Sequence, residues 1–267
     1  MTALDAIVLA EIEQRIADFD RVYSRFREDS LVARIAAEPG SYRFPPDAAP
    51  LFALYRRLYE ATDGAVTPLV GQALETLGYD RAYSLRPSGP ARPVPPWDEA
   101  FGWDGERLTV LRPVTVDVGA AGKGYLVDLV AGLLRDHGID EYVVDASGDM
   151  VHRGEGSLRV GLEHPLDSTM AIGVYELRNR ALCASATNRR SWGTDLHHVI
   201  DAATGLPTRA VIATWAIADS ALLADGLATA LFFAGEEALS GFDFQFVRMF
   251  STGHVEHSAQ FDGELFL

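Results

Sequence analysis

The segment from Val116 to Asp128 constrains the fold most, because its sequence changes from β-branched to glycine-rich to helical within a few residues. The run Val114–Val118 is apolar and β-branched, which predicts a buried strand. The run Gly119–Gly122 has almost no side-chain bulk, so a ligand can approach its backbone closely. A helix is expected from Tyr125 to about His137. The segment therefore predicts a strand, a tight loop and a helix whose N-terminus faces that loop.

Such a helix N-terminus is a ready anion-binding site, and Lys123 would add a mobile positive charge beside it. Asp117, near the end of the expected strand, can accept hydrogen bonds from a sugar or a base. Glycine-rich turns are common, so an ordinary tight turn is the alternative. The lysine in the turn and the aspartates on either side, Asp117 and Asp128, favour a phosphate-containing ligand.

Two familiar phosphate-binding patterns fail in this segment. Asp117 occupies the place of the first P-loop glycine, and Gly124 follows Lys123 where Ser or Thr is required. The dinucleotide pattern of three spaced glycines is also absent, because Ala121 stands two residues after Gly119. A ligand here would be bound by another arrangement.

The bulk properties narrow the class of partner. The chain has 267 residues, is 48% hydrophobic and carries a formal net charge of −15. This charge argues against nucleic acid and anionic membranes as partners, because both need basic surfaces, but it permits a small phosphate ligand. The single cysteine, Cys183, rules out an internal disulfide framework. We expect no transmembrane segment, and a cytoplasmic location for the sequence as written, or an extracytoplasmic one if an export signal has been trimmed.

Helical patterns precede strand patterns along the chain, which predicts an α+β fold. A helical N-terminal half, about 1–80, should pack on a mostly antiparallel, strand-rich core, about 105–267, in one domain spanning 1–267. The expected N-terminal helices cover Leu4–Phe19, a short stretch capped by Ser30 and running through Ala37, about Ala48–Thr62, and Thr67 to about Leu77. The expected strands are Leu108–Leu111, Val114–Val118, Tyr142–Val144, Leu158–Leu162, Met170–Tyr175, Ala181–Ala184, His198–Ile200, Val211–Ile217, Phe244–Phe250 and Val255–Phe266.

A second candidate site lies in a helix expected from Ser220 to Ala234, with Asp219 as its N-cap and Gly235 as its end. Asp225 and Thr229 lie one turn apart on the same face of this alanine- and leucine-rich segment. Their oxygens suit Mg²⁺, which also keeps water and substrate phosphates as ligands. A solvated polar face is the alternative for the same residues.

The pair His197-His198 lies in a short expected strand followed by a turn. Adjacent strand residues point to opposite faces, so the two rings should not share a metal ion. One of them could orient or deprotonate a hydroxyl nucleophile. A histidine packed at the end of a strand is the alternative for either residue.

Five motifs in order give the chain a resemblance to the FAD:protein FMN transferase family, often called ApbE. They are Asp-x-Gly-x-x-x-Lys-Gly-Tyr-x-x-Asp at 117–128, Gly148-Asp149, Ala184-Ser185, His-His-x-Ile-Asp-x-x-Thr-Gly-x-Pro at 197–207 and Ala-Asp-x-x-x-Thr at 224–229. Upstream, Gly64-Ala65 also matches. Val66-Thr67 replaces the phenylalanine and aspartate usual in that family.

The resemblance implies an α+β flavin transferase that uses Mg²⁺ and FAD. It would transfer FMN to a threonine of an acceptor flavoprotein and release AMP. By this resemblance, Asp225, Thr229 and the Ala120 carbonyl hold the metal. Lys123, Asp117, Ile200, Gly64 and Ala65 contact FAD.

The catalytic residues implied by the resemblance are His198, which would activate or orient the acceptor threonine, and Asp225. Two alternatives stay open. An FAD pyrophosphatase would use the same site with water as the acceptor, yielding FMN and AMP. A catalytically degenerate flavin-binding protein would bind FAD without turnover.

Overall fold

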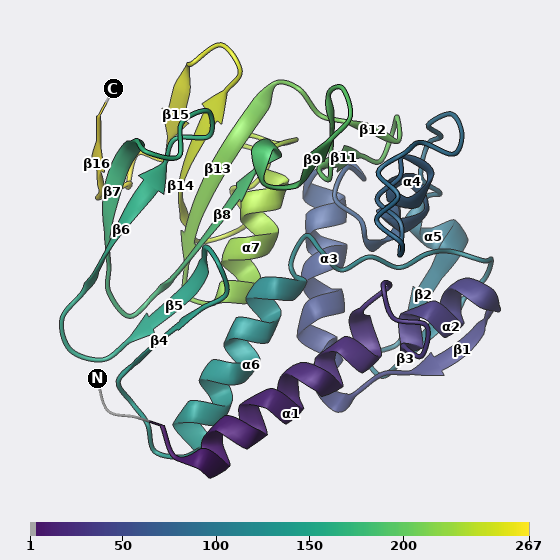
Figure 1. Ribbon diagram of the computed structural model, residues 1–267, viewed down its shortest axis with the longest axis horizontal. Coiled ribbons are helices and arrows are strands. Elements are labelled where there is room, and N and C mark those ends of the chain that lie inside the picture. The colour runs from purple at the N-terminus through teal and green to yellow at the C-terminus, as the bar shows by residue number, and fades with distance from the viewer. Residues whose placement is uncertain (1–3, 267) are drawn as a thin grey trace.

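The computed structural model describes residues 4–266 and confirms the predicted α+β class, with helices first and antiparallel strands after them (Figure 1). The helices are α1 (Ala6–Tyr23), α2 (Leu31–Ala37), α3 (Ala49–Ala61), α4 (Gly71–Thr76), α5 (Trp97–Ala100), α6 (Gly122–Asp136) and α7 (Ala221–Ala230). The described residues also form three short 3-10 turns: η1 (Pro46–Ala48) precedes α3, η2 (Pro68–Val70) precedes α4, and η3 (Thr187–Arg190) lies between two strands of the later half.

The described strands form one large and several small antiparallel sheets. The large sheet has the order β15-β14-β13-β8-β5-β4, and a second sheet has the order β16-β7-β6. Their strands are β4 (Tyr142–Asp145), β5 (Asp149–Arg153), β6 (Leu158–Glu163), β7 (Ala171–Leu177), β8 (Ala181–Ala186), β13 (Val211–Ala218), β14 (Gln245–Phe250), β15 (Val255–His257) and β16 (Glu264–Leu265).

The remaining strands make three small sheets outside these two. The three-stranded sheet has the order β1-β3-β2, and two pairs of very short strands join β9 to β10 and β11 to β12. Their strands are β1 (Gly40–Arg43), β2 (Phe101–Trp103), β3 (Arg107–Val110), β9 (Ser191–Trp192), β10 (Leu196–His197), β11 (Ile200–Asp201) and β12 (Leu206–Pro207).

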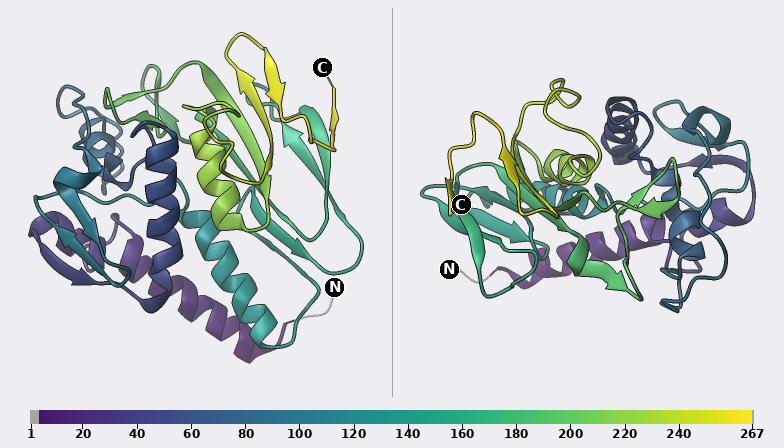
Figure 2. Two further views of the ribbon diagram at one scale, coloured as in Figure 1. Left: turned by 180° about the vertical axis from the view of Figure 1, so that it is seen from behind. Right: turned by 90° about the horizontal axis from the view of Figure 1, so that it is seen from above.

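The large sheet lies between two different layers. Helices α6 and α7 pack on one face, while β6 and β7 cover the other through a separate apolar cluster that includes Leu162, Tyr175 and Trp215. Helix α3 packs against α7, and α1 packs against α6 (Figure 2). Helix α7 is therefore surrounded by apolar neighbours, which explains why its sequence is apolar on nearly all sides.

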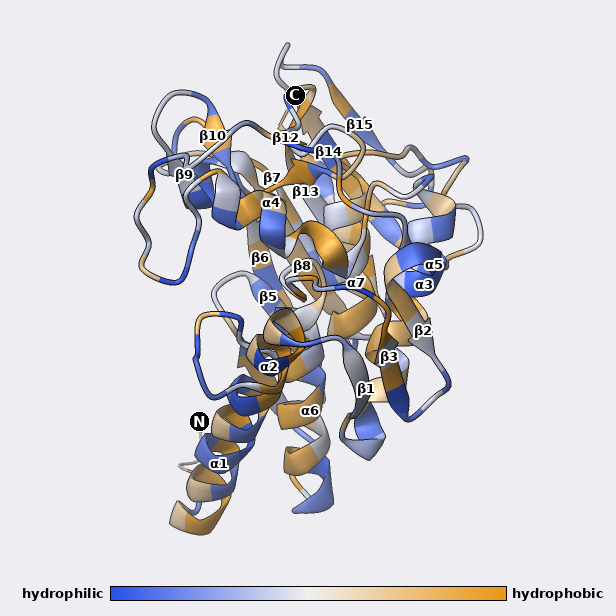
Figure 3. Ribbon diagram, turned by 90° about the vertical axis from the view of Figure 1, so that its right-hand side faces the viewer, coloured by the Kyte–Doolittle hydropathy of each residue, from blue (hydrophilic) through white to orange (hydrophobic). Residues whose placement is uncertain are grey.

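The N-terminal helices begin where their sequence predicts. The Ser30 hydroxyl accepts the Ala33 N–H at 3.1 Å and caps α2, as expected. The Thr67 hydroxyl caps η2 in the same way. Helix α1 alternates polar and apolar residues along its length, and only part of this surface packs on α6 (Figure 3). Within residues 4–266, no helix is long and apolar enough to cross a membrane.

Helix α7 differs at both ends from the prediction. Its N-cap is Ser220, whose hydroxyl accepts the Leu223 N–H at 3.2 Å, so the assignment of Asp219 was wrong. The helix ends at Ala230, before the expected stop at Gly235. Asp128 of α6 also accepts the N–H groups of Ala221 and Leu222, at 2.9 and 2.8 Å. This carboxylate joins the two helices, so Asp128 has a structural role rather than a ligand-binding one.

Around the glycine-rich segment, the predicted strand is absent and the helix begins early. Residues 113–118 form no strand, although Val114, Val116 and Val118 are buried. They pack in the main core, and the Asp117 N–H bonds the Pro68 carbonyl. An apolar run can thus be buried without a β ladder. Helix α6 starts at Gly122, so Lys123 lies in its first turn rather than in the loop.

Two further strand predictions were wrong in detail. His198 lies between β10 and β11 instead of starting a strand. The expected closing strand Val255–Phe266 is two short strands, β15 and β16, which belong to different sheets.

Candidate active site

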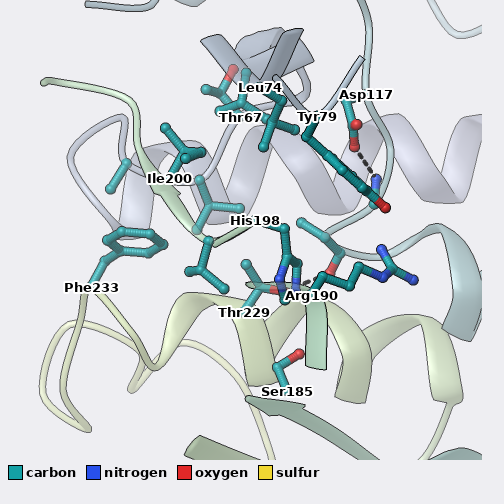
Figure 4. Close-up of a pocket in the computed structure, with 16 residues that line it drawn as sticks. Thr67, Leu74, Tyr79, Asp117, Ser185, Arg190, His198, Ile200, Thr229 and Phe233 are labelled. Atoms are coloured by element: carbon teal, nitrogen blue, oxygen red, sulfur yellow. Dashed lines mark hydrogen bonds between the residues drawn. The ribbon is translucent and has the colours of Figure 1, made fainter. Parts of the chain in front are cut away.

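A pocket of about 590 Å³, open to solvent, lies where the N-terminal helical region meets the ends of α6, α7 and β8 (Figure 4). Six of the predicted site residues line it: Ala65, Asp117, Ala120, His198, Ile200 and Thr229. Asp225 and Lys123 are not part of its lining. Gly64 precedes the lining residue Ala65 and has a φ angle of +85°, a left-handed conformation that glycine adopts readily.

The floor of the pocket brings two neutral oxygens together. The Thr229 hydroxyl donates to the Ala120 carbonyl at 3.1 Å, although 109 residues separate them in the chain. Asp225 lies one helical turn before Thr229 and is only 3% exposed. Its Oδ2 accepts the Gly124 N–H of α6 at 2.8 Å. The alternative of a solvated polar face is therefore wrong for Asp225.

Close packing of α6 and α7 produces this floor. A Cβ added to Gly124 would lie 2.1 Å from the Ala221 carbonyl oxygen and 2.6 Å from Asp225 Cβ. Only glycine permits the two helices to approach this closely. The glycine after Lys123 therefore serves helix packing as well as the site.

Behind the floor, Lys123 is paired rather than mobile. Its Nζ lies 3.0 Å from Oδ2 of Asp149, a fully buried residue, and 3.4 Å from the Ser147 carbonyl oxygen. Burial raises the pKa of Asp149 even though Lys123 opposes the shift. The pKa of Asp225 is raised well above its usual range by burial first and by the charge of Asp149 second. Asp149 is thus paired with Lys123, whereas Asp225 has no cationic side chain paired with it among the described residues, which favours a further cation beside Asp225.

The chemistry of the floor fits a hard divalent cation. Among the described residues, no three His, Cys, Asp or Glu side chains are grouped to hold a metal ion. The predicted ligand set depends instead on one carboxylate, one hydroxyl and one carbonyl. Neighbouring ligands of an octahedral Mg²⁺ ion lie about 3 Å apart when each bond is about 2.1 Å long. The 3.1 Å separation of the Thr229 and Ala120 oxygens matches that spacing.

Asp117, another lining residue of the pocket, is held in place by two partners. Its Oδ1 accepts the Gly119 N–H at 2.7 Å, and its Oδ2 pairs with Arg25 Nε at 2.5 Å. Arg25 is 4% exposed and lies over the rings of Phe26 and Tyr79. Sequence reasoning missed Arg25, because 92 residues separate it from Asp117 and no local pattern marks the pair.

His198 and His197 are directed to different places, as predicted, although not by a strand. His198 is partly exposed to the pocket and lies near Arg190 and Thr229 in Figure 4. Its Nδ1 is buried and has no hydrogen-bond partner within residues 4–266. Burial, followed by the charge of Arg190, lowers the pKa of His198 to about 4. Outside the pocket, His197 bonds the Thr208 carbonyl at 2.8 Å through Nε2.

The remaining wall is apolar and aromatic. Val66, Leu74 and Tyr79 line it together with Ile200. Tyr79 stacks on Trp192 with ring centres 5.5 Å apart. Sequence reasoning missed Tyr79 and Arg190. An aromatic residue after the short helix that ends near Leu77 was the available signal for Tyr79, and two adjacent arginines before the histidine pair were the signal for Arg190.

The fold is that of known flavin transferases. The structure of the ApbE protein from Thermotoga maritima superimposes with a TM-score of 0.83 at 23% identity, covering 96% of this chain and 90% of that one. The flavin transferase ApbE from Vibrio cholerae gives a TM-score of 0.79 at 22% identity, covering 96% and 89%.

Sequence comparison establishes the family. The chain belongs to the ApbE family, whose model matches residues 1–243. The FAD:protein FMN transferase of Vibrio cholerae serotype O1 is 28% identical over 253 residues, covering 85% of this chain and 73% of that protein. The enzyme of the same name from Klebsiella pneumoniae is 27% identical over 249 residues, covering 85% and 71%. The resemblance noted from the motifs is thereby confirmed.

Proposed function

We propose that this enzyme transfers FMN from FAD to a threonine hydroxyl of an acceptor flavoprotein and releases AMP. The contact between Thr229 and Ala120 carries the proposal, because it places two metal-type oxygens in a pocket that also contains His198. The names of the relatives give the same reaction class.

In this proposal, Mg²⁺ is held by the Asp225 carboxylate, the Thr229 hydroxyl and the Ala120 carbonyl. When bound, the ion neutralises negative charge that develops on the pyrophosphate during cleavage. The Asp225 Oδ1 is the oxygen that remains for it, since Oδ2 already accepts the Gly124 N–H. Lys123, in the first turn of α6, adds positive potential near this site.

The residues of this chain supply the remaining steps. His198 is neutral at pH 7, because its pKa is lowered to about 4, so a ring nitrogen can accept the proton of the threonine hydroxyl. The hydroxyl oxygen forms a bond to the phosphorus of the FMN half. The bond from that phosphorus to the bridging oxygen breaks, and AMP leaves with the oxygen. Tyr79, Ile200 and Ala65 would pack on the flavin, and Asp117 would contact it from its fixed position.

The test is incubation of the purified protein with FAD, with and without Mg²⁺, and with a mixture of threonine-containing peptides. Mg²⁺-dependent AMP release coupled to covalent FMN on a peptide is the expected result. AMP and free FMN formed without any acceptor would identify a pyrophosphatase instead. Tight FAD binding without AMP release would identify a flavin-binding protein without transferase activity.

A further inference from the structure

A second groove lies beside the active-site pocket, between the large sheet and the edge of β6. It holds about 900 Å³ of space open to solvent. Its floor is apolar and comes from Met150, Leu182 and Trp215 of the large sheet. Val160 and Gly161 of β6 form one wall. The reaction proposed above assigns no role to this groove.

The groove and the active-site pocket meet around the end of β8. Ser185, near the end of β8, lines both cavities. In η3, which follows β8, Arg189 lines the groove and Arg190 lines the pocket. A molecule in the groove can therefore reach the pocket around the end of β8, where Ser185 lies below His198 and Arg190 in Figure 4.

The turn between β4 and β5 links the groove to Lys123. Ser147 and Gly148 line the groove, and both have positive φ angles, 60° and 100°. The Ser147 carbonyl accepts from Lys123 Nζ at 3.4 Å, and the next residue but one, Asp149, pairs with the same lysine. The rim of the groove is thus attached to the charged residues behind the floor of the active site.

Strand β6 presents an unpaired backbone edge. It pairs with β7, and in the described part of the chain it ends the sheet ordered β16-β7-β6. The Phe266 N–H bonds the Ile172 carbonyl, so even-numbered residues of β7 turn their backbone groups toward β16. The odd-numbered residues then bond β6 at positions that include Val160 and Leu162. The alternation leaves the N–H and C=O groups of Arg159 and Gly161 pointing away from β7.

We propose that the acceptor protein docks in this groove as an extended segment that adds a strand to β6. The inference rests on the proposed FMN transfer, which requires a hydroxyl from another protein to reach the pocket. Free N–H and C=O groups in register select a polypeptide backbone, and an apolar floor accepts its alternate side chains. The segment would pass over Met150 and Trp215 and place its threonine beside Ser185, at the entrance to the pocket.

Gly161 offers a matched pair of variants. Gly161→Pro removes the outward N–H at a strand edge, where proline is tolerated. Gly161→Ala keeps the N–H and adds only a methyl group, whose nearest neighbour, the Ala171 Cβ, would be at an ordinary 3.9 Å. Ala184→Met independently fills the groove from the large sheet, because Ala184 lines it and is only half-buried.

The experiment measures FMN transfer to peptides of about 12 residues with a central threonine, long enough to form a strand of about six residues. FAD binding is measured separately by quenching of flavin fluorescence. We expect Gly161→Pro and Ala184→Met to lower transfer at least about tenfold, with the FAD dissociation constant within about twofold of wild type. Gly161→Ala should behave as wild type. Hydrogen exchange should show protection of the Arg159 and Gly161 amides when the peptides are added.

The outcomes of these measurements distinguish the docking proposal from the transferase proposal. Full transfer by Gly161→Pro and Ala184→Met, without protection of the β6 amides, would overturn the docking proposal and leave the transferase proposal intact. Absence of FMN transfer by wild type would overturn the transferase proposal. The hydrogen-exchange result would then show whether the groove binds polypeptide at all. Protection of β6 without added peptide that depends on protein concentration would mean that a second copy of this chain occupies the groove, which also overturns the proposal.

Discussion

The floor and the wall of the active-site pocket are built in different ways. The floor belongs to α6 and α7, two helices packed so closely that only glycine fits at position 124. The wall comes from short elements and loops, where Tyr79, Leu74 and Ile200 offer mainly apolar and aromatic surface. The charged groups thus depend on helices anchored in the core, whereas the proposed flavin contacts depend on the shape of an apolar surface.

The same difference explains which parts of the sequence match the family motifs. The lysine, aspartate and threonine motifs of the floor are intact at Lys123, Asp225 and Thr229. In the wall, Val66-Thr67 stands where a phenylalanine and an aspartate are usual, and both residues still line the pocket. Tyr79 stacked on Trp192 supplies aromatic surface to the same wall. An apolar contact with a ligand can be supplied by a neighbouring side chain, whereas few residue types can replace a metal ligand.

The largest expected effect is that of Asp225→Asn in the floor. The amide oxygen can still accept the Gly124 N–H, so the fold should persist, while the negative charge toward the metal is lost. Transfer should fall at least about 1,000-fold, because a metal ion contributes several kcal/mol to such transition states. AMP release and Mg²⁺ titration calorimetry measure the two effects. The control is Asp219→Asn, a largely exposed aspartate just before α7. Unchanged Mg²⁺ affinity in Asp225→Asn would exclude Asp225 as a ligand.

Gly124→Ala tests the close packing beneath the floor. The new methyl group would overlap the Ala221 carbonyl oxygen, so the free energy of unfolding should fall by about 3 kcal/mol. Urea denaturation measures the change. Gly132→Ala is the matched control in the same helix, because its Cβ would meet only Arg135 Nη2, at 3.8 Å. It should stabilise the protein by about 0.5 to 1 kcal/mol. Equal stabilities for the two variants would show that α6 and α7 can separate without cost.

His198→Gln tests the histidine at the boundary of floor and wall. The unfolded chain binds a proton at His198 below pH about 6.5, whereas the folded protein binds it only below about 4. Wild type therefore loses stability as the pH falls through this window, by about 2 kcal/mol between pH 7.5 and pH 5. The variant should lack this contribution, so the difference between the two unfolding free energies should change with pH. Parallel curves would mean that the ring titrates normally in the folded protein.

Tyr79→Leu should have the smallest effect, because it alters only the wall. Loss of the aromatic surface should weaken FAD binding by about threefold to tenfold, since an aromatic pair contributes about 0.5 to 1.5 kcal/mol. Fluorescence quenching of FAD measures the dissociation constant. Tyr83→Leu is the control, because Tyr83 stacks on Phe26 and is 54% exposed outside the pocket lining. A loss for Tyr79→Leu as large as that for Asp225→Asn would remove the contrast between wall and floor.

Much of the floor could be predicted from sequence because its signals are local. Helical periodicity places Asp225 and Thr229 on one face, and the motif order indicates the family. The partners of those residues could not be predicted in the same way. The pairing of Lys123 with Asp149 and the capping of α7 by Asp128 join segments far apart in the chain.

The sequence by itself determined the α+β class and most of the helical stretches, since these depend on residue type and short-range spacing. Only the tertiary structure decided that Val114–Val118 is a mostly buried segment rather than a strand, because a strand exists only where a neighbouring backbone satisfies its N–H and C=O groups. The burial of Asp225 and its raised pKa were also decided only by the tertiary structure. Asp225 has its raised pKa because α3, α6 and the large sheet remove water from around α7.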